Sequence, residues 1–350
     1  MGTRPWDLVT NKRAFLARVL EAAGAIRTLE ALADSRRSVV LTYHRIATPG
    51  PSNPFYDPTV SATSESLRAQ MAMLRDRFRV VPAERLIDPP DSADPRPLAA
   101  VTFDDGCRDN FTAALPVLRE FEIPATFFIP TDYLERPRLP WWDHVAFVVK
   151  ATRLERFTIP RAPDDPAPIV VDLTDHDRSA AIMGLIRPIL DGEVADRDGF
   201  LKRLEDRAQV DVDSRILGRD LFMSWSHLKA MAAEGHAIGS HAHSHVALGT
   251  LSDHDARREL ALSRSILEAA VNRPVRAVAY PYGWPGAVSD RTFRLAAAVG
   301  YRVGFTAFEG AVRPGLDPLS LPRLNVGGGD SPPLLRARAA LWRTLGRSWL

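Results

Sequence analysis

Short apolar runs alternate with helical patterns along most of this chain, and that rhythm limits the possible folds more than any other feature. The runs at 38–43 (SVVLTY), 97–103 (PLAAVTF) and 124–129 (PATFFI) have the length and composition of buried strands. The stretches at 65–77 and 109–122 have helical patterns. Because strands joined by helical connections pair in parallel, the sequence predicts an α/β fold with a parallel sheet.

The rhythm breaks between 131 and 220 and then resumes. The interrupting segment contains PRLPWWDH, a Pro- and Asp-rich stretch, and helical patterns near 177–191 and 197–208. Further strands are expected near 79–81, 236–241, 276–281, 301–306 and 319–326, and further helices at 224–235, 252–271 and 289–299. We therefore expect a main domain over 37–327 that carries 131–220 as a helical insertion or subdomain on its rim.

Bulk properties exclude several classes of protein. The 350 residues suffice for one large α/β domain with an insertion or for two modest domains. A net charge of +2 gives no reason to expect a nucleic-acid partner. The single cysteine, Cys107, excludes a disulfide framework and a cysteine-based zinc finger. Charges interrupt the apolar runs of residues 1–24, so no signal peptide or membrane span is visible and a cytoplasmic protein is expected.

Both ends of the sequence are predicted to be amphipathic helices, over 1–36 and 328–350. One stripe of the first helix is expected to hold Phe15, Val19, Ala22, Ile26 and Leu29. The last helix is basic, with Arg336, Arg338, Arg343 and Arg347 beside Leu334, Leu341, Trp342 and Leu345. Such helices either make peripheral contact with the inner face of a membrane or pack against the barrel with their arginines in solvent. The pattern favours packing.

Polar residues gather where four of the predicted strands end. They are His44, the pair Asp104-Asp105, the pair His241 and His245, and the segment Tyr280-Pro-Tyr-Gly. In parallel sheets and barrels, functional groups collect at the carboxyl ends of the strands. Two imidazoles and one carboxylate form a common catalytic metal site. On a helical turn His241 and His245 would share one face, which leaves His243 as a neighbour and His236 in the core.

The segments TFDDG, GHAIGSHAHSH and AYPYG resemble the first three motifs of the NodB-like polysaccharide deacetylases, carbohydrate esterase family 4. The resemblance runs from about 38 to 326 and implies a distorted (β/α)7 barrel that removes acetyl groups from sugars with a divalent metal. It implies that Asp104 is the general base and that the backbone N–H of Tyr282 stabilises the oxyanion. The implied metal ligands are Asp105, His241 and His245, with zinc as the usual ion and nickel or cobalt as alternatives.

Two departures from the family pattern shape the remaining assignments. The usual Leu-x-x-His-Asp segment that supplies the general acid is missing. However, LTYHRI resembles the subgroup that deacetylates poly-N-acetylglucosamine, which makes His44 the candidate acid; the alternative is a strand-end histidine bonded to backbone. The arginine expected before the third motif is Ala279 here. We expect Arg323, or failing that Arg108, to orient Asp104.

The expected substrate is an N-acetylated saccharide, free or lipid-linked, in polysaccharide or glycolipid biosynthesis. Trp141, Trp142 and Trp284 are candidates for stacking on sugar rings, although the first two suit a hydrophobic plug equally well. One alternative is an amidohydrolase of the same fold that acts on a small non-sugar amide. A non-catalytic glycan-binding relative is disfavoured, because the base and all three metal ligands are present.

Overall fold

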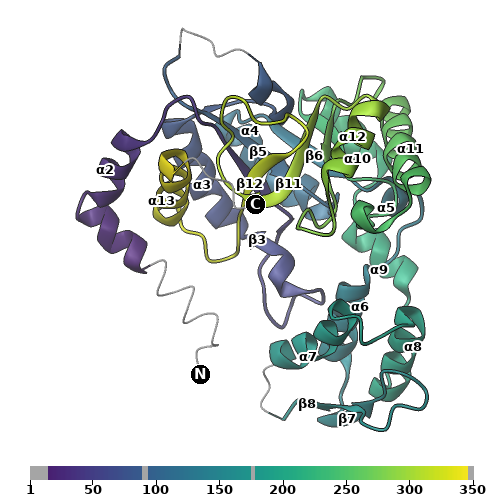
Figure 1. Ribbon diagram of the computed structural model, residues 1–350. Coiled ribbons are helices and arrows are strands. Elements are labelled where there is room, and N and C mark those ends of the chain that lie inside the picture. Colours follow the sequence, from purple (N-terminus) through teal and green to yellow (C-terminus); the bar gives the residue numbers. More distant parts are fainter. Residues whose placement is uncertain (1–14, 89–93, 175–177, 346–350) are drawn as a thin grey trace. The chain divides into compact units, whose positions relative to one another are not determined.

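Seven parallel strands close into a barrel in the computed structural model, which describes residues 15–88, 94–174 and 178–345 (Figure 1). In spatial order the strands are β1 (Val39–Tyr43), β12 (Leu321–Asn325), β11 (Val303–Glu309), β10 (Ala277–Ala279), β9 (Ala237–Ser240), β6 (Ala125–Ile129) and β5 (Leu98–Phe103). Because β1 pairs with both β12 and β5, the ring has no open edge. A short strand, β4 (Arg79–Val80), pairs with the start of β5. The predicted distorted (β/α)7 barrel is confirmed.

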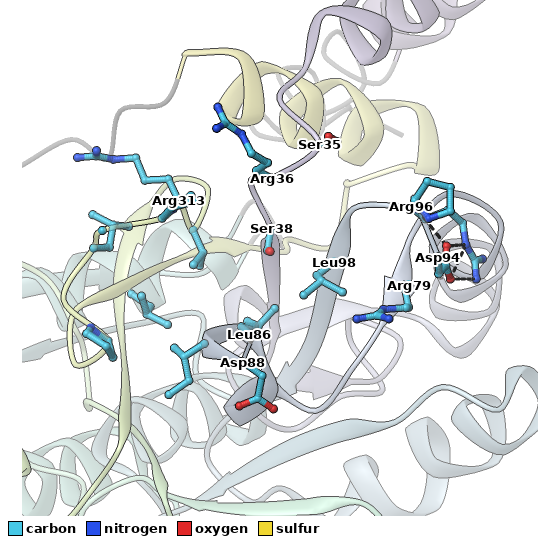
Figure 2. Close-up of a pocket in the computed structure, with 18 residues that line it drawn as sticks. Ser35, Arg36, Ser38, Arg79, Leu86, Asp88, Asp94, Arg96, Leu98 and Arg313 are labelled. Atoms are coloured by element: carbon cyan, nitrogen blue, oxygen red, sulfur yellow. Dashed lines mark hydrogen bonds and ion pairs between the residues drawn. The ribbon is translucent and has the colours of Figure 1, made fainter. Parts of the chain in front are cut away.

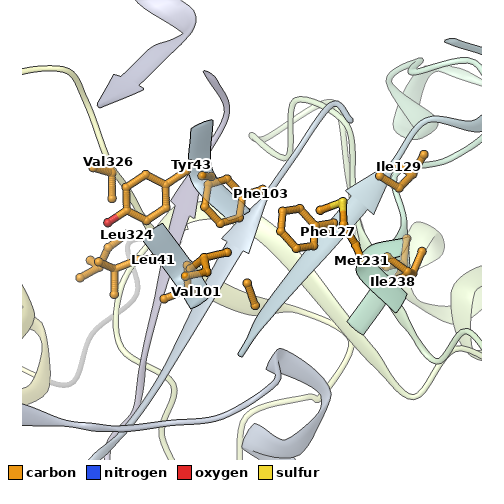
Figure 3. Close-up of a cluster of buried hydrophobic side chains, with 14 of the residues drawn as sticks. Leu41, Tyr43, Val101, Phe103, Phe127, Ile129, Met231, Ile238, Leu324 and Val326 are labelled. Atoms are coloured by element: carbon orange, nitrogen blue, oxygen red, sulfur yellow. The ribbon is translucent and has the colours of Figure 1, made fainter. Parts of the chain in front are cut away.

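Alternate residues of each strand face opposite sides of the barrel wall. In β1, Val39, Leu41 and Tyr43 pack outward in the large hydrophobic cluster shown in Figure 3. Val40 belongs to a second cluster, which also contains Ala100, Phe128, Val303 and Phe305 and fills the interior. This two-residue period explains why the strands could be predicted from short apolar runs: both faces of the wall are buried.

Helices cover the outside of the barrel. They include α3 (Ser64–Arg77), α4 (Leu115–Phe121), α10 (Trp225–Ala233), α11 (Asp253–Val271) and α12 (Asp290–Val299), with the short α5 (Thr131–Glu135) after β6. Side chains of Thr63, Ser224 and Ser252 cap the amino ends of α3, α10 and α11. The helix predicted over 109–122 starts as a π-helix, Asn110–Ala114, before it continues as α4. π-helical turns are frequent at functional sites, and this one follows the TFDDG segment.

A second unit comprises Thr48–Pro58 and Pro137–Leu221. It contains α6 (Trp141–Ala151), α7 (Arg178–Leu190), α8 (Arg197–Ala208), α9 (Ser214–Leu221) and a hairpin of β7 (Arg156–Ile159) with β8 (Ile169–Asp172). These elements enclose a hydrophobic core of their own. Lys150 Nζ joins Thr48–Pro58 to α6 through the carbonyls of Asn53, at 2.8 Å, and Phe55, at 2.6 Å. The sequence does not predict that Thr48–Pro58 belongs here.

The single helix predicted over 1–36 is wrong within the residues that the structure describes. A helix over 15–22 ends in a turn, and α2 (Ala25–Leu32) follows. Gly24 has a φ of 75°, a left-handed conformation that interrupts the helix. The predicted apolar stripe is therefore split: Ile26 is buried, whereas Phe15 and Val19 are exposed. Residues 1–14 lie outside the described part of the chain.

The helix predicted over 328–350 is observed as α13 (Pro332–Leu345), beside α2 (Figure 1). The expected solvent-facing arginines are wrong for Arg336 and Arg343, which are buried. Arg336 makes a two-bonded ion pair with Glu30, at 2.7 and 2.9 Å, and also contacts Glu21. Arg347 lies outside the described residues. None of the described helices is long and apolar enough to span a membrane.

We expect His236→Asn to make the fold less sensitive to acid. His236 is buried at the start of β9, where its Nδ1 accepts a hydrogen bond from the Ala125 N–H. Burial lowers its pKa below the ordinary 6.5, so the unfolded chain binds this proton first. The wild type should therefore lose stability as the pH falls below 6.5. Asn keeps an acceptor but cannot be protonated.

Urea unfolding at about pH 7 and about pH 5.5 measures this effect. The loss of unfolding free energy between the two pH values should be smaller for the variant by up to about 1 kcal/mol. Equal losses in both proteins would contradict the assignment of His236 as a buried neutral group.

Candidate active site and metal centre

The inward-facing set of residues continues past the ends of the strands and assembles the site. Along β5 the set runs through Ala100 to Asp104, and along β1 it runs through Val40 to His44. Tyr43 pairs with Phe103, and the Asp104 N–H donates to the Tyr43 carbonyl at 2.9 Å. Strand period and register together therefore bring the two residues that follow β1 and β5 to neighbouring positions.

Asp104 is held by Arg323 from the inward face of β12. Arg323 Nη1 and Nη2 donate to the two carboxylate oxygens at 2.9 and 2.8 Å, and Arg323 Nε donates to the Thr306 carbonyl at 2.9 Å. Both side chains are buried. Burial alone would raise the pKa of Asp104, but this pKa lies below its usual value, and the charge of Arg323 is the largest cause that lowers it. Arg323, the first of the two predicted candidates, therefore contacts Asp104.

Asp105, His241 and His245 form a group that could hold a metal ion. The Oδ1 atom of Asp105 lies 3.4 Å from His241 Nε2 and 3.1 Å from His245 Nε2. His241 Nδ1 lies 2.7 Å from the Ala279 carbonyl, which can only accept a hydrogen bond. The proton is therefore on Nδ1, and the Nε2 lone pair points into the group as a metal ligand requires.

The electrostatics of this group fit a cation. No donor among the described residues reaches the buried Asp105 Oδ1 with hydrogen-bond geometry. Burial would raise the pKa of Asp105, yet the neighbouring His245 and His241 hold it well below the ordinary value. A buried carboxylate oxygen that faces two imidazoles and lacks a donor is a group that could hold a divalent ion.

Left-handed backbone places these groups. Asp105, Ala242, His245 and Tyr282 have φ values of 69°, 58°, 55° and 64°, although none of them is glycine. Such conformations are costly outside glycine and concentrate at functional sites. The helical turn predicted for His241 and His245 is wrong, because the two lie in a loop after β9. Left-handed residues, rather than helical spacing, direct both imidazoles toward Asp105.

A carboxylate that the sequence analysis missed secures this loop. Glu259, on α11, accepts hydrogen bonds from the N–H groups of His243 and Ser244 at 3.0 and 2.8 Å. Its other oxygen accepts from the Ser244 hydroxyl. His243 itself bonds to Thr131 Oγ1 at 2.8 Å and lies outside the group of Asp105, His241 and His245; it belongs to a second group, with Asp132 and Glu135, whose ligand atoms lie close together. Nothing in the local sequence distinguishes Glu259 from other glutamates on helix surfaces.

His44 is fixed through its backbone. Its N–H donates to Ser61 Oγ at 2.9 Å, and its carbonyl accepts from Asn110 Nδ2 at 2.7 Å. Its positive charge, when protonated, contributes to lowering the pKa of both Asp104 and Asp105. The register of β1 and β5 places His44 next to Asp104 along the chain ends, because Tyr43 pairs with Phe103. Asn110 lies in the π-helix, so this irregular segment directs the Asn110 side-chain amide toward the His44 carbonyl at the end of β1.

The third motif brings Tyr282 and Trp284 to the same edge of the barrel. The Tyr282 ring centroid lies 5.1 Å from that of His245 and 5.0 Å from that of Trp284, which is half exposed. Gly283 is required, because a Cβ there would lie 2.5 Å from the Ala307 nitrogen. Trp141 and Trp142 are on α6 and pack against the core of the second unit. Their predicted contact with a sugar stays a prediction.

A separate cavity of about 600 Å³ opens at the other end of the barrel (Figure 2). Its lining includes Ser38, Arg79, Leu98 and Leu321, which lie just before or at the first residues of β1, β4, β5 and β12. The proposed base and metal ligands follow the last residues of their strands. This cavity is therefore not the candidate active site.

A NodB-like barrel is the class of protein that this strand order and this site define. A family model described as polysaccharide deacetylase matches residues 91–157 and 200–304. The unmatched stretch between them lies in the second unit. The chain belongs to the polysaccharide deacetylase family, carbohydrate esterase family 4.

Solved structures share the fold. The deacetylase PplD of Streptococcus pyogenes is 18% identical, with a TM-score of 0.57 over 87% of this chain and 98% of that chain. IcaB from Ammonifex degensii is also 18% identical, with a TM-score of 0.52 over 88% of this chain and 97% of that chain.

A curated relative matches by sequence. The putative polysaccharide deacetylase YxkH of Bacillus subtilis (strain 168) is 25% identical over 131 residues, which span 37% of this chain and 46% of YxkH. The match thus covers less than half of that curated relative.

We expect Arg323→Gln to destabilise the protein by about 3 kcal/mol or more, because it leaves the Asp104 carboxylate buried without its counter-charge. The double variant Asp104→Asn/Arg323→Gln removes both charges and should recover a large part of that loss. Urea unfolding at neutral pH measures all four members of this double-mutant cycle. Additive single effects would show that the two side chains do not depend on each other.

Proposed function

We propose that this protein hydrolyses the N-acetyl group of an N-acetylated sugar during polysaccharide or glycolipid biosynthesis. The observation that carries the proposal is the division of the adjacent carboxylates between two partners. Asp104 is bound by Arg323, and Asp105 faces His241 and His245. One carboxylate is thereby oriented to accept a proton while its neighbour is available to a metal ion. A non-catalytic glycan-binding protein would not need one carboxylate oriented as a base and a second one available to a metal ion.

Asp104 acts as the general base. An acetamide is a poor electrophile, so the attacking water must lose a proton as it adds to the carbonyl carbon. Arg323 lowers the pKa of Asp104 and keeps the carboxylate ionised near neutral pH. Arg323 also donates a hydrogen bond to each oxygen of Asp104, which restrains the orientation of the carboxylate and so the direction from which it accepts a proton. The backbone N–H of Tyr282 is the proposed donor to the oxygen that becomes negative.

His44 acts as the general acid. An amine leaves the tetrahedral intermediate only after its nitrogen has been protonated, so a proton donor must reach the leaving nitrogen. The clamp formed by Ser61 and Asn110 holds the His44 backbone at the end of β1, next to Asp104 in register. This acid and base come from neighbouring strands, which suits a substrate lying across the carboxyl edge of the barrel.

Asp105, His241 and His245 are the residues that would hold the metal, and we propose zinc, with nickel or cobalt as substitutes. A bound divalent ion would polarise the acetyl carbonyl and lower the pKa of a coordinated water. The carbonyl of Ala279 fixes His241 in the tautomer that leaves Nε2 available. The left-handed backbone of Asp105 turns its carboxylate away from that of Asp104 and toward the imidazoles.

A sugar is favoured over a small cyclic or linear amide. Trp284 is half exposed next to Tyr282, and an exposed indole suits the apolar C–H face of a pyranose ring. The family to which the chain belongs also acts on polysaccharides by its description. Screening acetate release from N-acetylated oligosaccharides against small acetamides tests this choice directly. If the protein hydrolysed only the small amides, the result would support the alternative function, an amidohydrolase of the same fold.

Asp104→Asn and His241→Ala should fail in different ways. Asp104→Asn keeps the three proposed ligands, so it should retain metal while losing about 100-fold or more in kcat. His241→Ala removes one ligand and should lose most of the metal as well as activity. Metal content by mass spectrometry after dialysis, together with acetate release, separates the two effects. Near wild-type turnover by Asp104→Asn would overturn the assignment of the base.

His44→Ala should slow amide hydrolysis more than ester hydrolysis. The phenolate of an activated acetate ester leaves without a proton, whereas an amine does not. We expect a loss of about 100-fold on an N-acetylated sugar and less than about 10-fold on 4-nitrophenyl acetate. His254→Ala, which changes an exposed histidine on α11, is the control. Equal losses on both substrates would make His44 a structural residue bonded through its backbone.

A further inference from the structure

The helix over 15–22 presents its apolar residues to solvent. Phe15, Leu16, Val19 and Leu20, named here the apolar stripe, are between 38% and 69% exposed. Their positions fall within about 140° around a helix with 100° per residue, so they form one continuous face. Among the described residues, seven of the eleven exposed large hydrophobic side chains lie on this helix, α2 and α13. Such a concentration marks an interaction surface.

The opposite face of the same helix is the one that packs. Ala17 is buried, and Glu21 pairs with Arg336 of α13. Glu30 of α2 pairs with the same arginine. The helix therefore buries Ala17 and contacts α13 through Glu21 while its large apolar side chains are exposed, the reverse of a helix that packs through its apolar face. Because Arg336 is buried and holds both glutamates, this orientation is fixed by an ion-pair network.

Because Glu21 and Glu30 are both paired with Arg336, the charged residues of these two helices that make no ion pair within the described part of the chain are arginines. The segment 15–32 contains four charged residues, namely Arg18, Glu21, Arg27 and Glu30. Arg18 and Arg27 are exposed and make no ion pair with any described residue. The segment thus combines exposed large apolar side chains with two exposed arginines, Arg18 and Arg27, whereas its two glutamates are paired with Arg336.

We propose that the apolar stripe, with Arg18 and Arg27, docks this protein on an anionic lipid surface. Interfacial helices bury apolar side chains at the boundary of headgroups and acyl chains, while their cations bind anionic headgroups. A second copy of the chain suits the surface less well, because a two-fold contact would place this cationic face against itself. The proposal concerns a peripheral contact and does not depend on the activity of the barrel.

Vesicle flotation of the full chain tests the proposal with matched variants. The vesicles are phosphatidylcholine alone, or phosphatidylcholine with about 30% phosphatidylglycerol. Leu16→Ser should lower the partition coefficient onto anionic vesicles about tenfold, because a buried leucine is returned to water. The control is Leu190→Ser in the second unit, because Leu190 is 55% exposed and Leu16 is 56% exposed. Leu190→Ser should bind as the wild type does.

Charge is tested separately. Arg18→Glu should also lower binding to the anionic vesicles about tenfold, and high salt should weaken binding by the wild type. Phosphatidylcholine alone should retain little of any variant. Recovery of the wild type only in the soluble fraction at low salt would overturn the proposal. So would equal losses in Leu16→Ser and Leu190→Ser, or a wild-type dimer in sedimentation that Leu16→Ser dissociates.

Discussion

The pairing of β1 with both β12 and β5 is the constraint on which the rest of the barrel unit depends. Because the sheet is closed, every second side chain of each strand points into the interior of the barrel. The same alternation continues for one residue past the strand ends, where polar groups replace apolar ones. Asp104 contacts Arg323, and His44 follows the strand between theirs, because β5, β1 and β12 are consecutive in the closed ring. An open sheet would leave β1 and β5 at separate edges.

Enclosure of two adjacent carboxylates is possible because each has its own partner. Arg323 compensates Asp104, and two imidazoles face Asp105. The left-handed conformation of Asp105 keeps both carboxylates at the inner end of the barrel, since an extended chain would send successive side chains to opposite faces of the wall. The strain at the end of β5 is thus tied to the electrostatics: without it, Asp105 would point away from His241 and His245.

Local patterns predicted the strands, most helices and the motif residues, because those depend on neighbours within a few positions. Features set by distant partners were not predictable. The joining of Thr48–Pro58 to the second unit depends on Lys150, and the inward turn of Arg336 depends on Glu30, which lies 306 residues away. Arg323 is predictable because the arginine expected before the third motif is replaced by Ala279. Nothing in the sequence indicates that Glu259 holds the loop of His243 and Ser244.

The ion pairs of Arg336 with Glu21 and Glu30 also set an order of events during synthesis. At about 5–20 residues per second, the helices over 15–32 leave the ribosome about 15–60 seconds before α13 is complete. Throughout that interval both glutamates lack their buried cation, and β1 lacks β12. The amino-terminal helices must therefore remain soluble, or be held by another molecule, until the ribosome has delivered the helix on which they dock.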